Sequence, residues 1–312
     1  MKFKKPNFWD LKRPNFISFL LLPFTLPIVI NNFFLKNKLS KKSRELKTIC
    51  VGNIYLGGTG KTPTTIKLYE ILKTLKFKVS TAKKMYKSQK DEAIILQKKT
   101  NFITAKNRNE IIKQAINNRQ NVVIFDDGLQ DRSVSYDLNF VCFDSATFIG
   151  NGCLIPSGPL REKLNSLKKY DGVFLKTNHE ISDYQLNLIK KYNNDIKIFE
   201  TFFEIKNLNE FNLADEYLIF SGIGNHESFR NILLKKNFKI KKEIIFPDHH
   251  SYKKNEIEDI IKQSKNLNLK IITTEKDYVK ISEMNSANIK FIDVKINIKD
   301  EQNLINFLKK NC

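Results

Sequence analysis

The chain has 312 residues, of which 41% are hydrophobic, so it is long enough to bury a sizeable core and to form about two domains. Its 54 Lys and Arg outnumber 33 Asp and Glu, and the formal net charge of +21 favours an anionic partner or surface. Nucleic acid is not expected as that partner, because no helix-turn-helix, RNA-recognition or zinc-finger pattern accompanies the charge. The four cysteines form no C-x-x-C pair, which argues against a disulfide framework or a zinc site and fits a reducing cytosol.

The first 45 residues contain a short apolar run, FISFLLLPFTLPIVI, at positions 16–30. This run falls short of the roughly twenty residues that a membrane-spanning helix needs. Pro23 and Pro27 are expected to kink the helix as well. The run therefore predicts a helix that lies in one leaflet of a membrane rather than one that crosses it.

Basic residues flank this run equally on both sides, which gives no positive-inside bias for a span. They are Lys2, Lys4, Lys5, Lys12 and Arg13 before it, and Lys36, Lys38, Lys41, Lys42 and Arg44 after it. Lysines in this arrangement can meet anionic head groups, so we expect an anionic membrane surface as a partner. The alternatives are a single span and a helix that covers an apolar patch of the protein itself.

A glycine-rich turn follows between a predicted strand that ends at Ile49 to Val51 and a predicted helix from Thr64 to Leu75. Its sequence, GGTGKT, lets backbone N–H groups turn inward and bind phosphate oxygens at the helix N-terminus. Lys61 would reach the β- and γ-phosphates of a nucleoside triphosphate, and the Thr62 hydroxyl would ligate Mg²⁺. The residues expected at the nucleotide are Gly57, Gly58, Thr59, Gly60, Lys61, Thr62 and Pro63.

The strict P-loop pattern G-x-x-x-x-G-K-[ST] is not met, since its first glycine falls on Tyr55. A glycine-rich turn without ligand is therefore the alternative interpretation. A second apolar run, Val122 to Phe125, ends in Asp126 and Asp127. Paired carboxylates after a buried strand can organise the Mg²⁺ of a P-loop protein, although Asp-Asp-Gly is also ordinary turn chemistry. We predict that the chain binds a nucleoside triphosphate with Mg²⁺.

Apolar runs alternate with polar helical segments along the rest of the chain. The predicted strands are 77–82, 101–105, 122–125, 138–143, 172–176 and 196–205, and 109–118 is a predicted helix. This alternation favours an α/β fold with a P-loop NTPase-type parallel sheet and helices on both faces. A second strand–helix series from Tyr217 predicts a smaller α/β domain. The expected ranges are 1–45 for the membrane-associated segment, 46–205 for the P-loop domain and 206–312 for the smaller domain.

Six short motifs occur in an order that resembles the tetraacyldisaccharide 4'-kinases. They are VGNIYLGGTGKTP, DDGLQ, GNGCLIPSGPLRE, SGIGNHESF, FPDHHSY and TTEKD, between about Ile49 and Asp277. The resemblance implies ATP-dependent transfer of the γ-phosphate to the 4'-hydroxyl of an acylated glucosamine disaccharide 1-phosphate, in lipid A and lipopolysaccharide biosynthesis. It also implies a place on the cytoplasmic face of the bacterial inner membrane.

The resemblance further implies roles for individual residues. KDEA resembles the G-D-E-P of the family, which makes Asp91 the general base on the acceptor hydroxyl and puts Glu92 at the metal. His249 resembles the histidine that assists the base, and Arg161 an arginine that meets phosphate charge. Gln130 matches a glutamine that follows the metal-site acids, and we count it among the nucleotide-binding residues. Taken alone, KDEA would be a charged surface turn and TTEKD a helix cap at Thr274.

The sequence departs from the family pattern at several positions. Only five residues separate Tyr86 from Asp91, where the family generally has a longer loop. Asp131 stands where histidine is common, and Cys153 where arginine is common.

The main rival is a membrane-associated P-loop switch or partitioning ATPase. Such proteins normally carry a second lysine earlier in the loop, where this chain has Leu56. We therefore expect a kinase that uses ATP and Mg²⁺, without an obligate protein partner.

Overall fold

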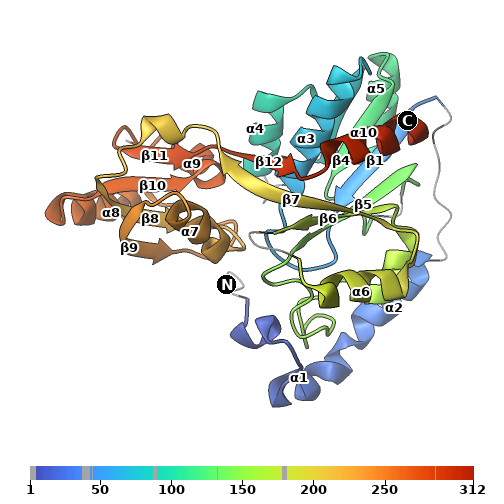
Figure 1. Cartoon of the computed structure of the whole chain (residues 1–312), viewed down its shortest axis with the longest axis horizontal. Helices are drawn as coiled ribbons and strands as arrows, with labels where there is room; N and C mark the ends of the chain where they lie inside the picture. The colour runs from blue at the N-terminus through green and yellow to red at the C-terminus, as the bar shows by residue number, and fades with distance from the viewer. Residues whose placement is uncertain are drawn as a thin grey trace. The chain divides into compact units, whose positions relative to one another are not determined.

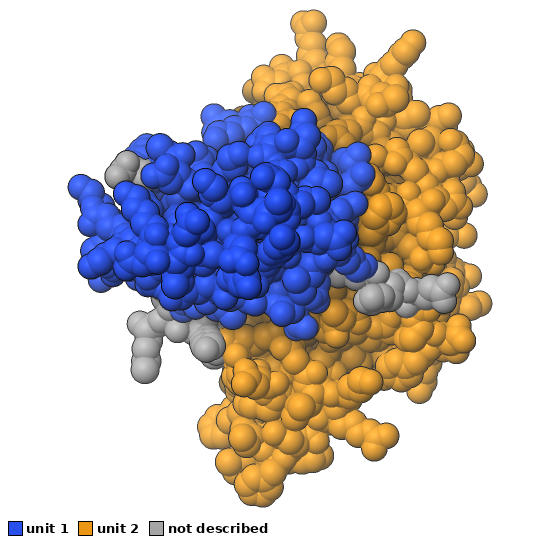
Figure 2. Space-filling model, turned by 60° about the vertical axis from the view of Figure 1, so that its left-hand side comes forward, with its two compact units in different colours: residues 1–4, 86–98, 203–295 blue, residues 5–85, 99–202, 296–312 orange. Residues whose placement is uncertain are grey.

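The computed structural model describes residues 5–36, 43, 45–86, 90–131, 133–177, 181–284 and 286–312 (Figure 1). The chain forms two compact units, which Figure 2 shows in separate colours. The larger unit contains residues 5–85, 99–202 and 296–312, and the smaller unit contains residues 86–98 and 203–295. These units differ from the expected ranges, because residues 86–98 belong with the smaller unit and the last seventeen or so residues fold back into the larger one.

The larger unit is built on an eight-stranded sheet. Its order is β12 (Val294–Ile298), β7 (Lys197–Ile205), β6 (Gly172–Lys176), β5 (Leu138–Asp144), β1 (Lys47–Gly52), β4 (Val122–Asp126), β2 (Val79–Lys84) and β3 (Phe102–Ala105). Every pairing from β7 to β3 is parallel. The predicted parallel sheet is confirmed, and the Asp-Asp pair lies at the carboxyl end of β4, with Asp126 as its last residue.

The central strands of this sheet, such as β1 and β4, are buried on both faces, because helices cover each face. Ile49 and Val51 of β1 face a core that holds the apolar side chains of α3 (Lys61–Thr74) and α10 (Glu301–Asn311). Cys50, on the opposite face, belongs to a core with α5 (Arg108–Asn117), α6 (Asp183–Tyr192) and the short helix η3 (Leu164–Lys169). The period of two along a strand explains this division.

The smaller unit has a four-stranded parallel sheet of its own. Its order is β11 (Ile289–Ile292), β10 (Lys270–Thr274), β8 (Glu216–Ser221) and β9 (Lys239–Ile245). Side chains of α7 (His226–Leu234) pack in one core, and those of α8 (Lys254–Asn266) and α9 (Glu275–Ile281) pack in another. The unit also contains η4 (Leu208–Glu210) and nearly all of α4 (Lys90–Lys99). The predicted second α/β series is confirmed.

The amino-terminal segment folds as η1 (Asn7–Asp10), α1 (Phe16–Leu21), η2 (Leu22–Thr25) and α2 (Leu26–Lys36). Pro23 lies in the break between the two α-helices, as predicted. Polar contacts fix the segment to the larger unit: the Asn151 amide donates to Ser18 Oγ at 2.9 Å, and the Trp9 indole N–H donates to the Pro156 carbonyl at 3.0 Å. Both Ser18 and Trp9 are fully buried.

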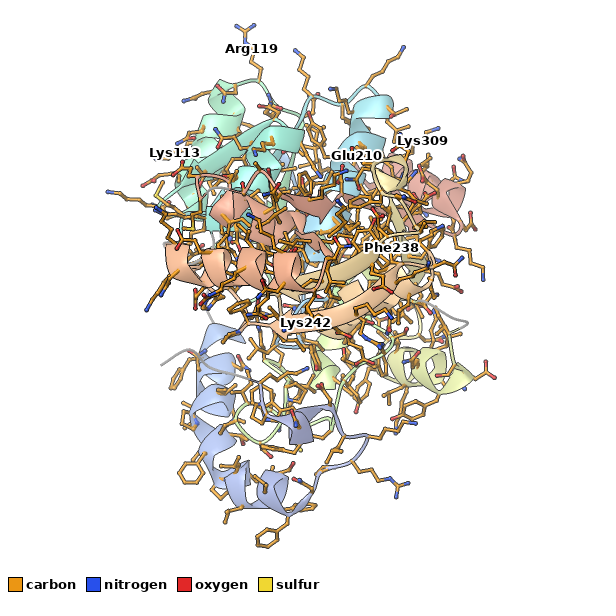
Figure 3. The ribbon with its side chains drawn as sticks, turned by 90° about the vertical axis from the view of Figure 1, so that its left-hand side faces the viewer. Lys113, Arg119, Glu210, Phe238, Lys242 and Lys309 are labelled. Carbon is orange, nitrogen blue, oxygen red and sulfur yellow. The ribbon has the colours of Figure 1, made fainter. Side chains whose placement is uncertain are left out.

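Most large apolar side chains of this segment nevertheless face solvent. Phe16, Phe24 and Phe34 are 80%, 65% and 69% exposed. Figure 3 shows aromatic side chains that project outward from these helices. In the described part of the chain, no helix has both the length and the apolar character needed to cross a membrane. The expected basic flank residues Lys2, Lys4, Lys38, Lys41, Lys42 and Arg44 lie outside the described residues.

Candidate functional site

The glycine-rich turn connects the end of β1 to the start of α3, which begins at Lys61. Gly60 precedes the helix with a φ of 85°, in the left-handed region that glycine adopts without strain. The Thr59 side chain is buried, and its hydroxyl has no hydrogen-bond partner among the described residues. A buried donor without a partner at a helix N-terminus fits a phosphate oxygen. The turn thus has the geometry of a phosphate-binding loop.

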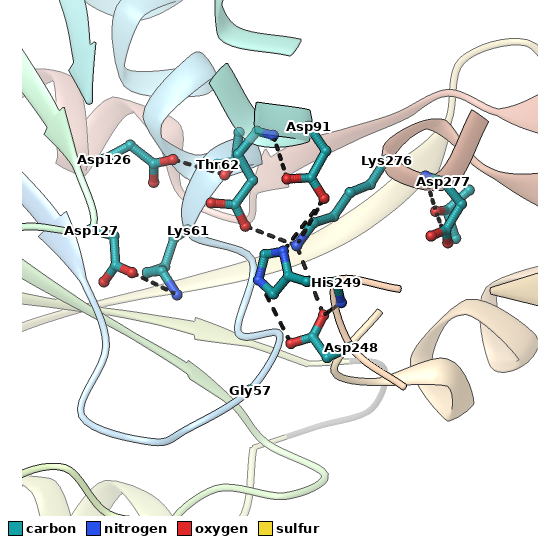
Figure 4. Close-up of polar contacts among 12 residues, drawn as sticks. Gly57, Lys61, Thr62, Asp91, Asp126, Asp127, Asp248, His249, Lys276 and Asp277 are labelled. Atoms are coloured by element: carbon teal, nitrogen blue, oxygen red, sulfur yellow. Dashed lines mark hydrogen bonds and ion pairs between the residues drawn. The ribbon is translucent and has the colours of Figure 1, made fainter. Parts of the chain in front are cut away.

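Thr62 and Asp126 meet where α3 begins and β4 ends. The Thr62 hydroxyl donates to Asp126 Oδ2 at 2.9 Å (Figure 4), and Lys83 Nζ lies 3.0 Å from the same oxygen. Hydroxyl and carboxylate oxygens suit Mg²⁺, which keeps several waters and needs few protein ligands when it binds substrate phosphates. The described residues contain no group of three or more His, Cys, Asp or Glu that could hold a metal. The fit to Mg²⁺ therefore depends on the Thr62–Asp126 pair.

Lys83 and Asp126 form a buried ion pair, with the two residues 2% and 1% exposed. We expect Lys83→Met to lower the free energy of unfolding by about 3–5 kcal/mol without metal or nucleotide, because it removes one partner of a buried ion pair. Urea unfolding of the full chain measures this change, with exposed Lys73→Met on α3 as the control. A change for Lys83→Met as small as that of the control would contradict the expectation.

Asp127 is held from four sides. Its backbone N–H donates to the Val51 carbonyl at 2.8 Å, and its own carbonyl accepts from the Arg108 guanidinium at 2.7 Å. Its carboxylate oxygens lie 3.8 Å from Lys61 Nζ (Figure 4) and 3.4 Å from an Arg161 guanidinium nitrogen. The φ of Asp127 is 62°, which an unsupported aspartate seldom adopts. Lys61 and Arg161, the two cations expected to meet phosphate charge, therefore both lie beside Asp127, an expected metal-site acid.

Gln130 connects the phosphate-binding loop to the loop that carries Arg161. Its side-chain amide donates to the Asn53 carbonyl at 2.9 Å and to Glu162 Oε1 at 3.1 Å, and its oxygen accepts from Arg161 at 3.3 Å. Asn53 in turn donates to the Gly57 carbonyl at 3.1 Å. These contacts give Gln130 a supporting role for the loop, and its contact with nucleotide stays a prediction.

Arg108 was not predicted, yet it is 1% exposed and supports the Asp127 backbone. It forms an ion pair with Asp131, the residue that departs from the family pattern. Burial raises the pKa of Asp131. Hydrogen bonds from Ser133 and the charges of Arg108 and Lys84 lower it by more than burial raises it, so the net pKa lies below the ordinary value. Asp131 therefore stays ionised and holds Arg108 in place.

A second cluster lies in the smaller unit, around Asp91 in the first turn of α4 (Figure 4). Asp91 is only 4% exposed, so it does not belong to a charged surface turn. Its Oδ1 accepts from the Glu92 backbone N–H at 3.0 Å. Its Oδ2 lies 3.5 Å from His249 Nδ1, 3.4 Å from Lys280 Nζ and 3.8 Å from Lys276 Nζ. The predicted base and its predicted histidine are thus neighbours.

The charges around Asp91 keep it ionised. Burial raises the pKa of Asp91, but the nearby His249 side chain and the charges of Lys276 and Lys280 lower it by more than burial raises it, so the net pKa lies below the ordinary value. For Lys276, burial lowers the pKa, but neighbouring carboxylates, Glu92 foremost, raise it above the ordinary value. At neutral pH the cluster holds a carboxylate that can accept a proton.

The predicted site residues fall into two sets, one in each unit. The larger unit contains Gly57 to Pro63, Asp126, Asp127, Gln130 and Arg161, and the smaller unit contains Asp91, Glu92 and His249. Glu92 pairs with Lys276 Nζ at 2.9 Å, and its expected role at the metal stays a prediction.

The prediction missed Lys83, Arg108, Lys276 and Lys280. Only the last two left a signal: Lys276 lies in TTEKD, and Lys280 follows it by four residues on the same helix face.

Comparisons with known proteins agree on one family. The family described as tetraacyldisaccharide-1-P 4'-kinase matches residues 17–312. A tetraacyldisaccharide 4'-kinase of Pelagibacter ubique is 43% identical and covers 99% of this chain and 98% of that protein. One of Rickettsia canadensis is 34% identical and covers 98% and 96%. The crystal structure of LpxK from Aquifex aeolicus in complex with ATP covers 94% of this chain and 99% of that chain, with a TM-score of 0.69 and 22% identity, and shares the fold.

Proposed function

Because the chain belongs to the tetraacyldisaccharide-1-P 4'-kinase family, we propose that it transfers the γ-phosphate of ATP to the 4'-hydroxyl of an acylated glucosamine disaccharide 1-phosphate, the lipid A precursor. The family match over residues 17–312 carries this proposal. The same match decides against a P-loop switch or partitioning ATPase. The contacts around Asp126 and Asp127 support a role of the larger unit in nucleotide binding. Those around Asp91 support a role of the smaller unit in proton transfer.

The larger unit is assigned to the nucleotide. Backbone N–H groups of residues 57–63 would bind the phosphates, and Lys61 would neutralise the β- and γ-phosphate charge. Arg161 contacts both Asp127 and Gln130, and we propose that its guanidinium meets the charge that develops on the transferred group. The relative from Aquifex aeolicus was crystallised with ATP, which agrees with this choice of nucleotide.

Thr62 and Asp126 would hold Mg²⁺, with Asp127 beside them. When bound there, the ion would supply neutralisation of phosphate charge. The oxygen ligands and the 2.9 Å contact between them suit this ion. Lys83, on the same carboxylate oxygen, would limit how much negative charge the pair presents. Glu92 remains a further candidate ligand.

The smaller unit is assigned to the acceptor. Asp91 would accept the proton of the 4'-hydroxyl as the hydroxyl oxygen attacks the γ-phosphorus and the bond from that phosphorus to the β-phosphate oxygen breaks, with ADP as the leaving group. His249 would orient Asp91 and share the proton. The 3.5 Å separation of His249 Nδ1 and Asp91 Oδ2 supports this pairing. Phosphoryl transfer depends mainly on positioning and charge, so a carboxylate with restricted motion suits this role.

The exposed apolar side chains of α1 and α2 support a place on the membrane. Such a surface next to lysines suits insertion among anionic head groups, where a lipid substrate is found. We therefore propose that the enzyme works on the cytoplasmic face of the bacterial inner membrane. Its lipid substrate would reach it within that surface.

Incubation with γ-labelled ATP, Mg²⁺ and the acylated disaccharide 1-phosphate tests the reaction. We expect one labelled phosphate, which mapping of the product places on the 4'-oxygen, and slow ATP use when the acceptor is omitted. Label at another position would disprove the assigned acceptor. ATP hydrolysis that the acceptor does not stimulate would contradict the kinase itself.

If α1 inserts into the membrane surface, polar substitutions in α1 should weaken membrane binding strongly. We expect the triple variant Phe16→Ser, Phe19→Ser, Leu20→Ser to bind anionic vesicles at least about tenfold more weakly, because three exposed apolar side chains lose their transfer free energy. Co-sedimentation measures this binding. Tyr184→Ser on α6, where the tyrosine is 65% exposed, is the control. Equal sedimentation of the triple variant and the control would remove the proposed anchor.

A further inference from the structure

Lys280 touches Asp91 from a helix that lies far along the chain. Its Nζ is 3.4 Å from Asp91 Oδ2, closer than either His249 or Lys276. Lys280 belongs to α9, and Asp91 to α4, and both lie within the smaller unit. None of the motifs in the sequence assigns a function to this lysine. Its contacts therefore call for an explanation.

The position of Lys280 is fixed by Asp277, which is fully buried. Lys280 Nζ donates to Asp277 Oδ1 at 3.0 Å. Asp277 Oδ2 accepts from the Gly222 backbone N–H at 2.9 Å and from the Thr274 hydroxyl at 2.8 Å. Thr274 also caps α9, as the TTEKD motif predicted. Lys280 is thus anchored on a carboxylate that cannot move independently of β8 and α9.

Aromatic and backbone groups complete the surroundings of this lysine. The ammonium lies 5.9 Å from the centre of the Tyr252 ring, at a distance where the ring face attracts a cation. Gly222, which binds Asp277 through its N–H, accepts a hydrogen bond from the His249 backbone N–H at 3.1 Å through its carbonyl. The Gly222 backbone therefore holds both the backbone of His249 and the Asp277 carboxylate to which Lys280 is bound. The side chains of His249 and Lys280 approach the same oxygen of Asp91.

We propose that Lys280, anchored on Asp277, is a positioning residue that holds the Asp91 carboxylate in the orientation needed to receive the acceptor proton. This inference extends the proposed kinase reaction and depends on it. The Asp91 carboxylate is fixed at both ends: the Glu92 N–H holds Oδ1, and Lys280 and His249 hold Oδ2. Without Lys280, the carboxylate loses its closest cation and can turn about its side-chain torsions.

Lys276 has a different role, although it belongs to the same helix. Its strongest contact is the 2.9 Å hydrogen bond to Glu92, and it lies farther from Asp91, at 3.8 Å. It also reaches Asp248 at 3.9 Å. Lys276 thus neutralises a set of carboxylates, whereas Lys280 joins Asp91 to one buried anchor. The two lysines should therefore respond differently to substitution.

Steady-state kinetics of Lys280→Met and Lys280→Gln test the role. We expect kcat to fall by about 10- to 100-fold with little change in KM for ATP, because a small displacement of a reacting group is costly. Lys280→Arg should recover part of this loss, since a guanidinium can bind both carboxylates. The matched control is Lys254→Met, which changes an exposed lysine of α8 and should leave kcat unchanged. Lys280→Gln keeps a hydrogen-bond donor on the side chain, and thermal unfolding identifies any variant that has lost its fold.

A double-mutant cycle with Asp91→Asn separates positioning from a general structural effect. If Lys280 acts through Asp91, adding Lys280→Gln to Asp91→Asn causes no further fall in kcat. A further fall equal to that seen in the parent would overturn the proposal, as would a Lys280→Gln enzyme with parental kcat.

The activity of the parent enzyme distinguishes a failure of the proposed function from a failure of the proposed role of Lys280. If the parent does not phosphorylate the acylated disaccharide phosphate, the proposed function fails. If the parent is active and only the Lys280 results disagree, the failure concerns Lys280 alone.

Discussion

An Asp91→Asn enzyme is expected to transfer phosphate about 10²- to 10⁴-fold more slowly than the parent, with an unchanged Kd for ATP. The substitution keeps the shape of the side chain and removes its capacity to take a proton. The fold should tolerate it, because the two nearby lysines keep their main partners, Glu92 for Lys276 and Asp277 for Lys280. Single-turnover transfer to the acylated acceptor measures the rate, and equilibrium titration with nucleotide measures the Kd.

The control for this substitution is Asp259→Asn, which changes an exposed carboxylate on α8 of the same unit. It should transfer phosphate at the parental rate. An Asp91→Asn enzyme that matches it would show that Asp91 is not the base. A Kd for ATP raised as strongly as the rate is lowered would show instead that Asp91 acts on the nucleotide.

Lys61→Ala should impair both halves of the reaction. We expect kcat/KM to fall by about 10²- to 10³-fold and ATP binding to weaken as well, because the lysine would contact phosphate charge in the ground state and the transition state. Lys61 also approaches Asp127 at 3.8 Å, so its loss leaves more negative charge beside the phosphates. Nucleotide titration and steady-state kinetics together measure the two effects.

Lys73→Ala provides the matched comparison, since Lys73 is exposed in the last turn of the same helix. Its kinetics should equal those of the parent. Normal ATP affinity in Lys61→Ala would contradict the assignment of the glycine-rich turn to the nucleotide. The pair of variants Asp91→Asn and Lys61→Ala thus separates proton transfer from phosphate binding.

Local sequence patterns predicted the main elements because those patterns report burial. The continuous apolar runs of β1 and β4 correspond to strands covered on both faces, and the glycine-rich turn lies between strand and helix as expected. The family was identified correctly because its motifs extend over most of the chain. Bounds were less accurate: α3 begins at Lys61, whereas periodicity alone suggested Thr64.

Pairings between distant segments could not be read in the same way. The segment IKFIDVKI, residues 289–296, falls in the range 206–312 expected for the smaller domain, yet β12 begins within it at Val294 and pairs in the large sheet. Ile298 enters the core of that sheet, and no local feature distinguishes it from Ile292, which packs in the smaller unit. The choice between the two sheets is made by tertiary packing.

Individual lysines were the hardest residues to assign. With 54 Lys and Arg in the chain, one more lysine carries little information. Lys83 becomes distinctive only through its burial beside Asp126, and Lys280 only through its contacts with Asp277 and Asp91. The Lys83–Asp126 and Lys280–Asp91 pairs join residues on different secondary-structure elements. Sequence spacing cannot predict them.

The path of the chain has a consequence for dissecting this enzyme into fragments. A fragment that ends near residue 205 loses α10, whose Leu304 and Leu308 are fully buried against the large sheet. The complementary fragment loses α4 and with it Asp91. Neither contiguous half is self-sufficient, so a split version should gain activity only when both pieces are co-expressed.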